Sequence, residues 1–210
     1  MKTLDLRKEL KYLYAPSAKK VELVQVPRFT FLMIDGAIEP GHGPGTSPFF
    51  QEATQAIYGA AYTLKFTAKQ RKGDPVDYPV MALEGLWWIE DGEFSLTRKD
   101  NWVYTLMILQ PDFITLEMFQ DALSQLRKKR GDQPAFSQLR LESFEEGLCV
   151  QIMHIGPYDA EPATKDKMDA FAREHGYTLR GKHHEIYLGN PLRADPAKLK
   201  TILRQPVVGL

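Results

Sequence analysis

Apolar residues in the first half of the chain follow two spacings, one typical of strands and the other typical of a helix. Stretches rich in β-branched and aromatic residues predict four strands, over Val21–Val26, Phe29–Ile38, Tyr78–Ile89 and Trp102–Leu109. We expect Pro27 to separate the first two, because proline has no amide hydrogen for the strand ladder. Between the second and third strands, apolar residues recur at helical spacing from Phe49 to Leu64, and Ser47 is suited to cap that helix.

The second half of the chain shows the same spacings in the same order. Strands are predicted over Leu139–Phe144, Leu148–Ile155 and Lys182–Leu188. The first two are expected to form a hairpin around Glu145–Gly147, and helical spacing follows over Pro162–His175. The last segment, Leu199–Val207, is ambiguous because its local pattern also permits a helix. We interpret it as a closing strand, because that assignment completes the order of elements seen in the first half.

This repeated order of elements predicts the fold. Two strands, a helix and two more strands lie between Val21 and Leu109, and the same order returns after Leu139. One such unit cannot bury both faces of its small sheet, whereas two copies side by side cover them and leave a groove at their seam. The sequence therefore predicts an α+β fold of two pseudo-twofold-related strand–helix–strand–strand repeats, with antiparallel sheets and a central ligand groove.

The domain organisation follows from the repeat. A length of 210 residues fits one medium domain or two tightly fused halves. Residues 1–19 are expected to form an N-terminal arm or a short helix, and residues 20–210 a single domain. Within that domain, the first repeat is expected over residues 20–131 and the second over residues 136–210.

Composition narrows the classes of partner. Lys and Arg number 27, Asp and Glu also number 27, and the formal net charge is zero, so the basic excess of a nucleic-acid-binding protein is missing. The single cysteine, Cys149, cannot form an internal disulfide, which favours a reducing compartment. No apolar stretch approaches the roughly 18 residues of a membrane span. We therefore expect a cytoplasmic protein with no direct nucleic-acid or membrane partner.

The most unusual segment is Leu83–Trp88, which carries two adjacent tryptophans on one predicted strand. Neighbouring residues on a strand point to opposite faces, so Trp87 and Trp88 face different sides of the sheet. One of them can be a core residue, while the other is exposed, at an interface or over a pocket. Gly85 in the middle of the strand indicates a bulge or the close approach of another group.

The matching strand of the second repeat, His183–Leu188, places Glu185 and Tyr187 on one face. We interpret Glu84 and Glu185 as holding comparable positions in the two repeats, near tryptophan and tyrosine respectively. A carboxylate among aromatic rings loses hydration, which raises its pKa and suits a general acid or base near neutral pH. Such a group can also pair with a ligand cation. The simpler alternative is an exposed glutamate on a strand.

A third segment, His154–Tyr158, contains a glycine–proline turn from which Tyr158 can hang over the groove, although a packing role is the alternative. His183 and His184 point to opposite faces, and the remaining histidines lack a recognisable ligand spacing, so no metal site is expected. The sequence contains no P-loop, no GxGxxG after a strand, no GxSxG and no HExxH. We therefore expect no cofactor.

Three segments, Leu83–Trp88, His154–Tyr158 and His184–Leu188, together resemble the GyrI-like small-molecule-binding family. Their order and their place on the repeat carry the likeness, which runs from about Val21 to the end of the chain. The resemblance implies tandem SHS2 modules, the strand–helix–strand–strand unit, with the ligand groove between them. Multidrug-sensing members use a buried glutamate in that groove to meet cationic aromatic drugs, and Glu185 is the matching position.

The resemblance also implies an activity and its residues. Many members carry an N-terminal helix-turn-helix domain, for which this chain is expected to have no room. Stand-alone members are similar to hydrolases that open the strained cyclopropane of DNA-alkylating natural products, and the paired tryptophans and the glutamate look more like that branch. Glu185 and Tyr158 are the implied catalytic residues. The implied ligand-binding residues are Glu84, Trp87, Trp88, Tyr104, Phe113 and Tyr187.

The expected function is thus the binding, and detoxifying hydrolysis, of small hydrophobic or aromatic compounds that are cationic or electrophilic. One alternative is a non-catalytic multidrug-binding protein that uses the same groove. A second is a protein-interaction role that modulates gyrase, which predicts a large exposed apolar patch. A third is a haem carrier. The sequence leaves open whether the protein is a monomer or a homodimer.

Overall fold

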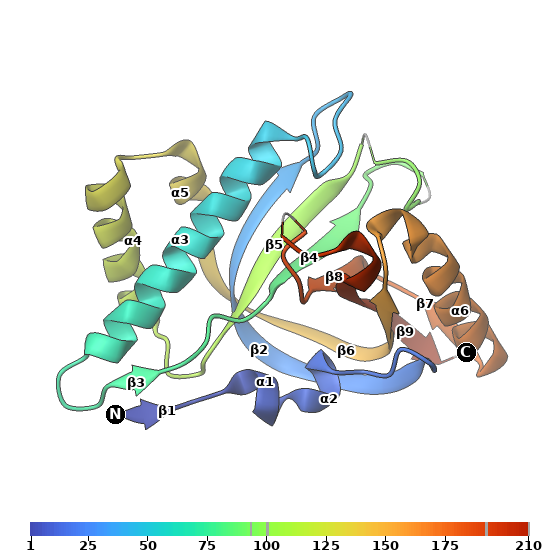
Figure 1. Ribbon diagram of the computed structural model, residues 1–210, viewed down its shortest axis with the longest axis horizontal. Helices are drawn as coiled ribbons and strands as arrows, with labels where there is room; N and C mark the ends of the chain where they lie inside the picture. The colour runs from blue at the N-terminus through green and yellow to red at the C-terminus, as the bar shows by residue number, and fades with distance from the viewer. Residues whose placement is uncertain (93, 100, 192, 210) are drawn as a thin grey trace.

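The computed structural model describes residues 1–92, 94–99, 101–191 and 193–209 and has a mixed α+β architecture (Figure 1). The strands are β1 (Lys2–Thr3), β2 (Glu22–Ala37), β3 (Val76–Asp77), β4 (Leu83–Trp88), β5 (Val103–Gln110), β6 (Arg140–Ile155), β7 (Tyr177–Leu179), β8 (His183–Tyr187) and β9 (Lys200–Gly209). The α-helices are α1 (Leu6–Glu9), α2 (Lys11–Tyr14), α3 (Pro48–Gln70), α4 (Leu116–Arg130), α5 (Pro134–Gln138) and α6 (Glu161–Glu174). Short 3-10 helices are η1 (Tyr158–Ala160) and η2 (Pro196–Lys198).

The order strand, helix, strand, strand occurs twice, as β2-α3-β4-β5 and as β6-α6-β8-β9, which confirms the predicted repeat. The main sheet runs β6-β2-β5-β4-β8-β9-β7, and β9 also pairs with β6, so the strands from β6 to β9 in this order close into a barrel. Every pairing in this barrel is antiparallel. The two repeats meet where β4 pairs with β8 and where β2 pairs with β6. The ambiguous last segment is strand β9, as the repeat predicts.

Two predicted interruptions are wrong, because β2 and β6 each continue as one strand of 16 residues. Pro27 lies within β2, and the predicted hairpin turn Glu145–Gly147 lies within β6. The residues on either side of Pro27 pair with Gly147 and Glu145 in one unbroken register. The proline therefore interrupts the ladder at a single position without ending the strand. This length lets β6 pair with β2 along its first part and with β9 along its last part.

Helices α3 and α6 pack against the sheet, and α4 lies beside α3 on the side away from the barrel (Figure 1). The side chain of Ser47 caps α3 by accepting the amide hydrogen of Phe50. The buried face of α3 consists mainly of small side chains, which let the helix approach the sheet closely. These buried residues are Ala53, Ala56, Ile57, Gly59, Ala60, Ala61, Leu64 and Ala68. Strand β4 begins at Leu83, five residues later than the sequence pattern predicts.

The N-terminal segment is tied to the barrel. Strand β1 pairs with β3 in parallel, and Leu13 and Tyr14 of α2 are buried in the core. The guanidinium of Arg204, on β9, donates a hydrogen bond to the carbonyl of Leu13 at 2.9 Å. The amide of Gln151, on β6, donates to the carbonyl of Tyr12 at 2.8 Å. These contacts place the segment that the sequence predicts as an arm or short helix directly against two barrel strands.

Candidate functional site

The side chains of β8 alternate between two faces of the barrel sheet, and its pairing with β4 fixes which side chains meet. Glu185 lies opposite Gly85, and His183 lies opposite Trp87. Because strand side chains alternate, Tyr187 shares this face with Glu185 and His183. We call it the helix-side face, since Phe50 at the start of α3 stacks on the indole of Trp87.

Glu185 sits at the end of a chain of hydrogen bonds on the helix-side face. The indole N–H of Trp87 donates to the hydroxyl oxygen of Tyr187 at 2.8 Å, and that hydroxyl donates to Oε2 of Glu185, also at 2.8 Å. Trp87 is 1% exposed and Glu185 is 4% exposed. Burial and the charge of Glu185 raise the pKa of Tyr187 well above its usual value, so the phenol remains a donor.

The glycine opposite Glu185 has a steric reason. A Cβ added to Gly85 would lie 2.7 Å from Nε1 of Trp87 and 3.3 Å from the hydroxyl oxygen of Tyr187. The indole therefore occupies the space that a side chain at this position would fill. The close approach that the sequence indicates at Gly85 comes from the hydrogen-bond chain that ends at Glu185.

Aromatic rings surround this chain. The ring of Trp87 lies 5.6 Å from Phe50, 4.9 Å from Trp102 and 5.6 Å from Tyr104, measured between centroids. Phe94, in the segment between β4 and β5, stacks on His183 at 5.5 Å. Flat apolar surfaces of this kind favour a flat apolar ligand, to which edge and face contacts add roughly 1 kcal/mol each.

Tyr158 joins the site from the turn between β6 and α6, and its ring meets Tyr187 edge-on at 6.0 Å. Burial, with the nearby charges of Glu161 and Glu185, raises the pKa of Tyr158 to about 12. The phenol therefore keeps its proton at neutral pH. Of the residues predicted from the sequence, the structure thus brings together Glu185, Tyr158, Tyr187, Trp87 and Tyr104.

Sequence reasoning missed one carboxyl of this site, Glu161. It is the first residue of α6 and only 2% exposed. Burial first, and then the negative charge of Glu185, raise the pKa of Glu161 to about 9. An acidic residue in the first turn is an ordinary sign of a helix start, so the pattern gave no reason to single it out. Only the fold reveals that it is buried close to a second carboxyl.

Several buried polar atoms of the site find no hydrogen-bond partner within the described part of the chain. They are Oε1 of Glu161, Oε1 of Glu185 and both ring nitrogens of His183, and we call them the open polar atoms. Nε2 of His183 lies 3.4 Å from Oε1 of Glu185. Buried polar groups are costly without partners, so such atoms mark a place where water or a ligand is expected to bind.

Glu84 faces the other side of the sheet, and the prediction that it holds a position comparable to Glu185 is wrong. Glu84 pairs with Ile186, whereas Glu185 pairs with Gly85. Because the two glutamates are offset by one residue, their side chains point to opposite faces of the sheet. We call this face, which lies opposite the helix-side face, the interior face. On it, Oε2 of Glu84 lies 3.1 Å from Nε2 of His184, and Oε1 accepts a hydrogen bond from Tyr14 at 2.6 Å.

The interior face holds a cluster of paired charges. Nδ1 of His184 lies 3.0 Å from Oε1 of Glu146, and Nη1 of Arg204 lies 3.3 Å from Oε2 of Glu146. Burial alone would lower the pKa of His184, but Glu146 and Glu84 outweigh it and raise the pKa to about 9. Burial alone would raise the pKa of Glu146, but His184 and Arg204 lower it to about 2. The two basic side chains of this cluster, His184 and Arg204, thus lie among the carboxyl groups of Glu146 and Glu84.

Two more predicted ligand residues lie away from Glu185. Trp88 is on the opposite face from Trp87, where the ammonium of Lys182 sits 3.2 Å from the centre of its ring. Phe113 lies beyond the far end of β5, and its ring meets Tyr78 at 5.8 Å. The structure therefore separates Glu84, Trp88 and Phe113 from the helix-side cluster.

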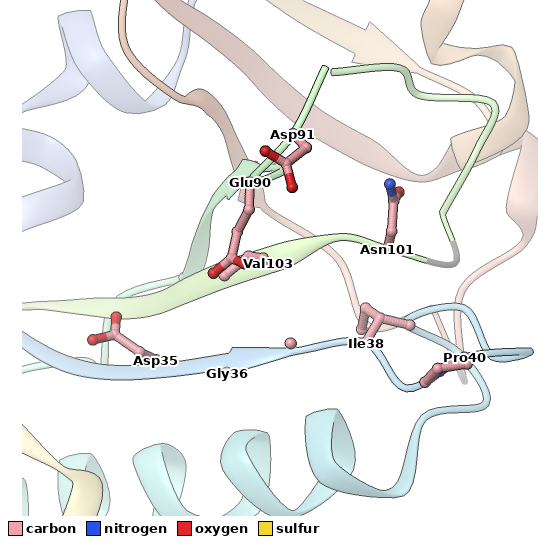
Figure 2. Close-up of a pocket in the computed structure, with 9 residues that line it drawn as sticks. Asp35, Gly36, Ile38, Pro40, Glu90, Asp91, Asn101 and Val103 are labelled. Carbon is pink, nitrogen blue, oxygen red and sulfur yellow. The ribbon is translucent and has the colours of Figure 1, made fainter. Parts of the chain in front are cut away.

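A cavity of about 670 Å³ lies elsewhere, between the end of β2, the start of β5 and the segment after β4 (Figure 2). Its lining includes the carboxylates of Asp35, Glu90 and Asp91 and the amide of Asn101. No residue of the predicted site contributes to this lining. Asp35 is already paired with Arg140, at 2.8 Å, and Glu90, Asp91 and Asn101 are exposed.

Within residues 1–92, 94–99, 101–191 and 193–209, no group of three or more His, Cys, Asp or Glu side chains is arranged to hold a metal ion. Among the helices described, none combines the length and the apolar character needed to cross a membrane.

Comparison with known proteins places this geometry in context. A family model described as a GyrI-like small molecule binding domain matches residues 19–207. A solved structure of an uncharacterized conserved protein from Listeria innocua is 41% identical, with a TM-score of 0.88, and the match covers 98% of this chain and 100% of that one. A hydrolase from Listeria innocua is 38% identical, with a TM-score of 0.83 and coverage of 98% and 100%.

A hydrolase encoded by lin2189 from Listeria innocua is 40% identical, with a TM-score of 0.85, and the match covers 99% of this chain and 100% of that one. No match to the chain was found among the curated proteins.

Proposed function

The chain belongs to the GyrI-like family of small-molecule-binding domains, and from this premise we propose that it is a hydrolase that opens strained, electrophilic rings in small aromatic compounds. The observation that carries the proposal is Glu185, a buried carboxylate held through Oε2 by Tyr187 while Oε1 is one of the open polar atoms. The hydrolases from Listeria innocua, at 38% and 40% identity, support the reaction class.

The rings around Glu185 suit a flat ligand. Trp87, Tyr104, Tyr158 and Tyr187 would contact its faces and edges and exclude bulk water from the reacting centre. Exclusion of water also protects an electrophile from uncontrolled reaction before it is positioned. The cation that some ligands carry would be drawn to the same carboxylate and rings.

The proposed step uses a single water molecule. Oε1 of Glu185 accepts a proton from the water while the water oxygen forms a bond to a carbon of the strained ring. A ring bond of that same carbon breaks, and its electron pair passes to the electron-accepting group of the compound. The relief of strain supplies much of the driving force. Tyr158, protonated at neutral pH, would donate a hydrogen bond that orients the water or the ligand. The product no longer alkylates DNA, because its electrophilic carbon has already been used.

The direct test is product analysis after mixing the protein with a cyclopropane-bearing DNA alkylator. We expect the wild type to form the ring-opened product and Glu185→Gln to lose at least about 100-fold in kcat, the low end of general acid–base effects. The matched control is Glu117→Gln, which replaces an exposed carboxylate on α4 by a carboxamide and should keep full activity. Full hydrolysis by Glu185→Gln would remove the acid–base role of this residue.

A second candidate function, non-catalytic binding, is favoured by the same open polar atoms among aromatic rings, because recognition needs them as much as turnover does. In that case the alkylator would quench the fluorescence of Trp87 in a saturable way, and product would not exceed the control without protein. Glu185→Gln would then weaken binding without any effect on a rate.

A further inference from the structure

The site contains two buried carboxyls, Glu161 and Glu185, whose surroundings differ. Glu185 accepts a hydrogen bond from Tyr187, which is itself supported by Trp87. Oε1 of Glu161 is an open polar atom, and Glu161 begins α6 at 2% exposure. Burial removes the solvation of a carboxylate, and the negative charge of Glu185 further favours the neutral form of Glu161.

Burial and a neighbouring charge set the protonation state of Glu161 and outweigh the influence of the Thr201 hydroxyl, which acts to lower its pKa. The carboxyl of Glu161 is desolvated at the start of α6, and the charge of Glu185 acts on it, so its neutral form is favoured. Glu161 is therefore a carboxylic acid at neutral pH.

We propose that Glu161 is the general acid of the site, which gives its proton to the atom that receives the electron pair when the strained ring opens. This inference rests on the proposed hydrolase function and adds a second reacting residue to it. It also restricts the substrates to rings conjugated to an electron-accepting group such as a carbonyl, because an accepting atom needs the proton that Glu161 supplies.

The step balances in atoms and electrons. The water oxygen forms a bond to the ring carbon, and the proton that the water loses goes to Glu185. The broken carbon–carbon bond gives its electron pair to the accepting atom, which takes the proton of Glu161. The net change is the addition of water to the substrate. Transfer of one proton from Glu185 to Glu161 restores the starting state.

A general acid imposes a pH dependence on the rate. Because the pKa of Glu161 is raised to about 9, kcat should fall as the pH rises through that value and Glu161 loses its proton. The titratable and charged groups that act on Glu161 come from β8, from η1 and from the segment between β4 and β5: Glu185, Tyr187, Tyr158, Asp159 and Lys99. Lys99 opposes the shift, and it also pairs with Asp159 at 2.9 Å.

The test compares Glu161→Gln with the wild type on two cyclopropane-bearing alkylators that differ in the strength of the conjugated electron acceptor. We expect kcat to fall about 100- to 10,000-fold with the weaker acceptor and less with the stronger one, which needs less help from an acid. Saturable quenching of Trp fluorescence should change by less than about threefold, because the amide keeps the shape of the site. Glu174→Gln, at the exposed end of α6, is the matched control.

A second measurement tests the role of Glu161 separately from the proposed hydrolase function. Infrared difference spectra of the wild type at neutral pH should show the carbonyl band of one neutral carboxylic acid, absent from Glu161→Gln. Wild-type turnover with an unimpaired Glu161→Gln, or a neutral-acid band that survives this substitution, would overturn the role of Glu161 alone. A wild type without turnover would overturn the hydrolase and the proton-transfer step together, even if the band is present.

Discussion

On the interior face of β8, the imidazole of His184 lies between two carboxylates, 3.1 Å from Glu84 and 3.0 Å from Glu146. One residue further along, on the helix-side face, Glu185 has one hydroxyl donor, while its second oxygen is an open polar atom. All three glutamates and the histidine are at most 4% exposed. Equal burial thus accompanies several ion pairs around one histidine on the interior face, although Oε2 of Glu84 and Nε2 of His184 make no hydrogen bond. On the helix-side face it accompanies a single hydroxyl donor and a His183 contact at 3.4 Å.

The difference indicates what each face is for. Ion pairs within a barrel can hold strands and the N-terminal segment in one arrangement, as the bonds of Arg204 to Leu13 and Gln151 do here. A buried polar atom without a partner costs about 1–3 kcal/mol, and a fold keeps it where a ligand or a reacting water will supply the partner. Burial alone therefore does not identify a functional carboxyl, and neither does an oxygen without a hydrogen bond, because Oε2 of Glu84 is also such an atom. The helix-side face differs in the aromatic rings that surround its open polar atoms.

The largest effect on this comparison is expected from Arg204→Met. The substitution leaves Glu146 buried with His184 as its remaining ion-pair partner and removes the bond to the N-terminal segment. Breaking a buried pair from one side costs about 3–5 kcal/mol, so the free energy of unfolding in urea should fall by that amount. Arg173→Met, at an exposed position, is the control. A loss below about 1 kcal/mol would mean that the interior charges do not hold the barrel together.

An intermediate effect is expected from Gly85→Ala on the helix-side face. The new methyl group would lie 2.7 Å from Nε1 of Trp87 and force the indole away from Tyr187. Overpacking of this kind costs about 1–3 kcal/mol in unfolding free energy. The proposed hydrolysis should fall with it, because Tyr187, the donor to Glu185, loses its hydrogen bond from the indole.

The control for Gly85→Ala is Gly45→Ala, where an added Cβ meets nothing within 4 Å. Trp fluorescence and urea unfolding would be measured for both variants. Unchanged emission and activity in Gly85→Ala would show that the Trp87–Tyr187–Glu185 chain does not shape the site.

The smallest effect is a pH dependence of stability. The folded-state pKa of Glu161 is raised from 4.5 to about 9, so between these values the folded state binds more protons than the unfolded state and stability falls as pH rises. The pKa of His184 is also raised, from 6.5 to about 9, so its stabilising contribution is lost only above about pH 6.5. Between pH 5 and pH 6, the raised pKa of Glu161 therefore lowers the stability as the pH rises, whereas the raised pKa of His184 has little effect.

In that pH window, the unfolding free energy of the wild type should fall relative to Glu161→Gln by roughly 1 kcal/mol. Urea unfolding of both proteins at the two pH values measures this difference, and no turnover is needed. A constant difference would mean that Glu161 titrates as an ordinary exposed glutamate and that the two faces do not differ in the way described.

The repeat could be predicted from the sequence because strand and helix spacings are local signals, and their order survives divergence. The comparison of Glu84 with Glu185 failed because it matched two motifs by residue type. A one-residue offset keeps the residue type but reverses the face of a strand. Pro27 led to the wrong prediction of a strand break. The strand pairing of the residues on both sides of it keeps β2 continuous, although the proline itself has no amide hydrogen to donate.

Glu161 could not be predicted because its importance depends on distance in space. It is separated from Glu185 by 24 positions and lies on a helix start, where acidic residues are common. Tyr187 could be predicted to share a face with Glu185, since two positions on one strand fix that relation. The site therefore divides into a part set by strand periodicity and a part set by the packing of α6.

The closure of the barrel also has a consequence for folding kinetics. Strand β2 pairs with β6, whose residues lie more than a hundred positions later, and β6 must in turn find β9. Such pairings have a high contact order, and high contact order slows folding. During synthesis, the first repeat would leave the ribosome with the edges of β2 and β4 unpaired, and unpaired edges invite association with other chains. We therefore expect the protein to be prone to aggregation until its last strand, β9, has been synthesised and has paired.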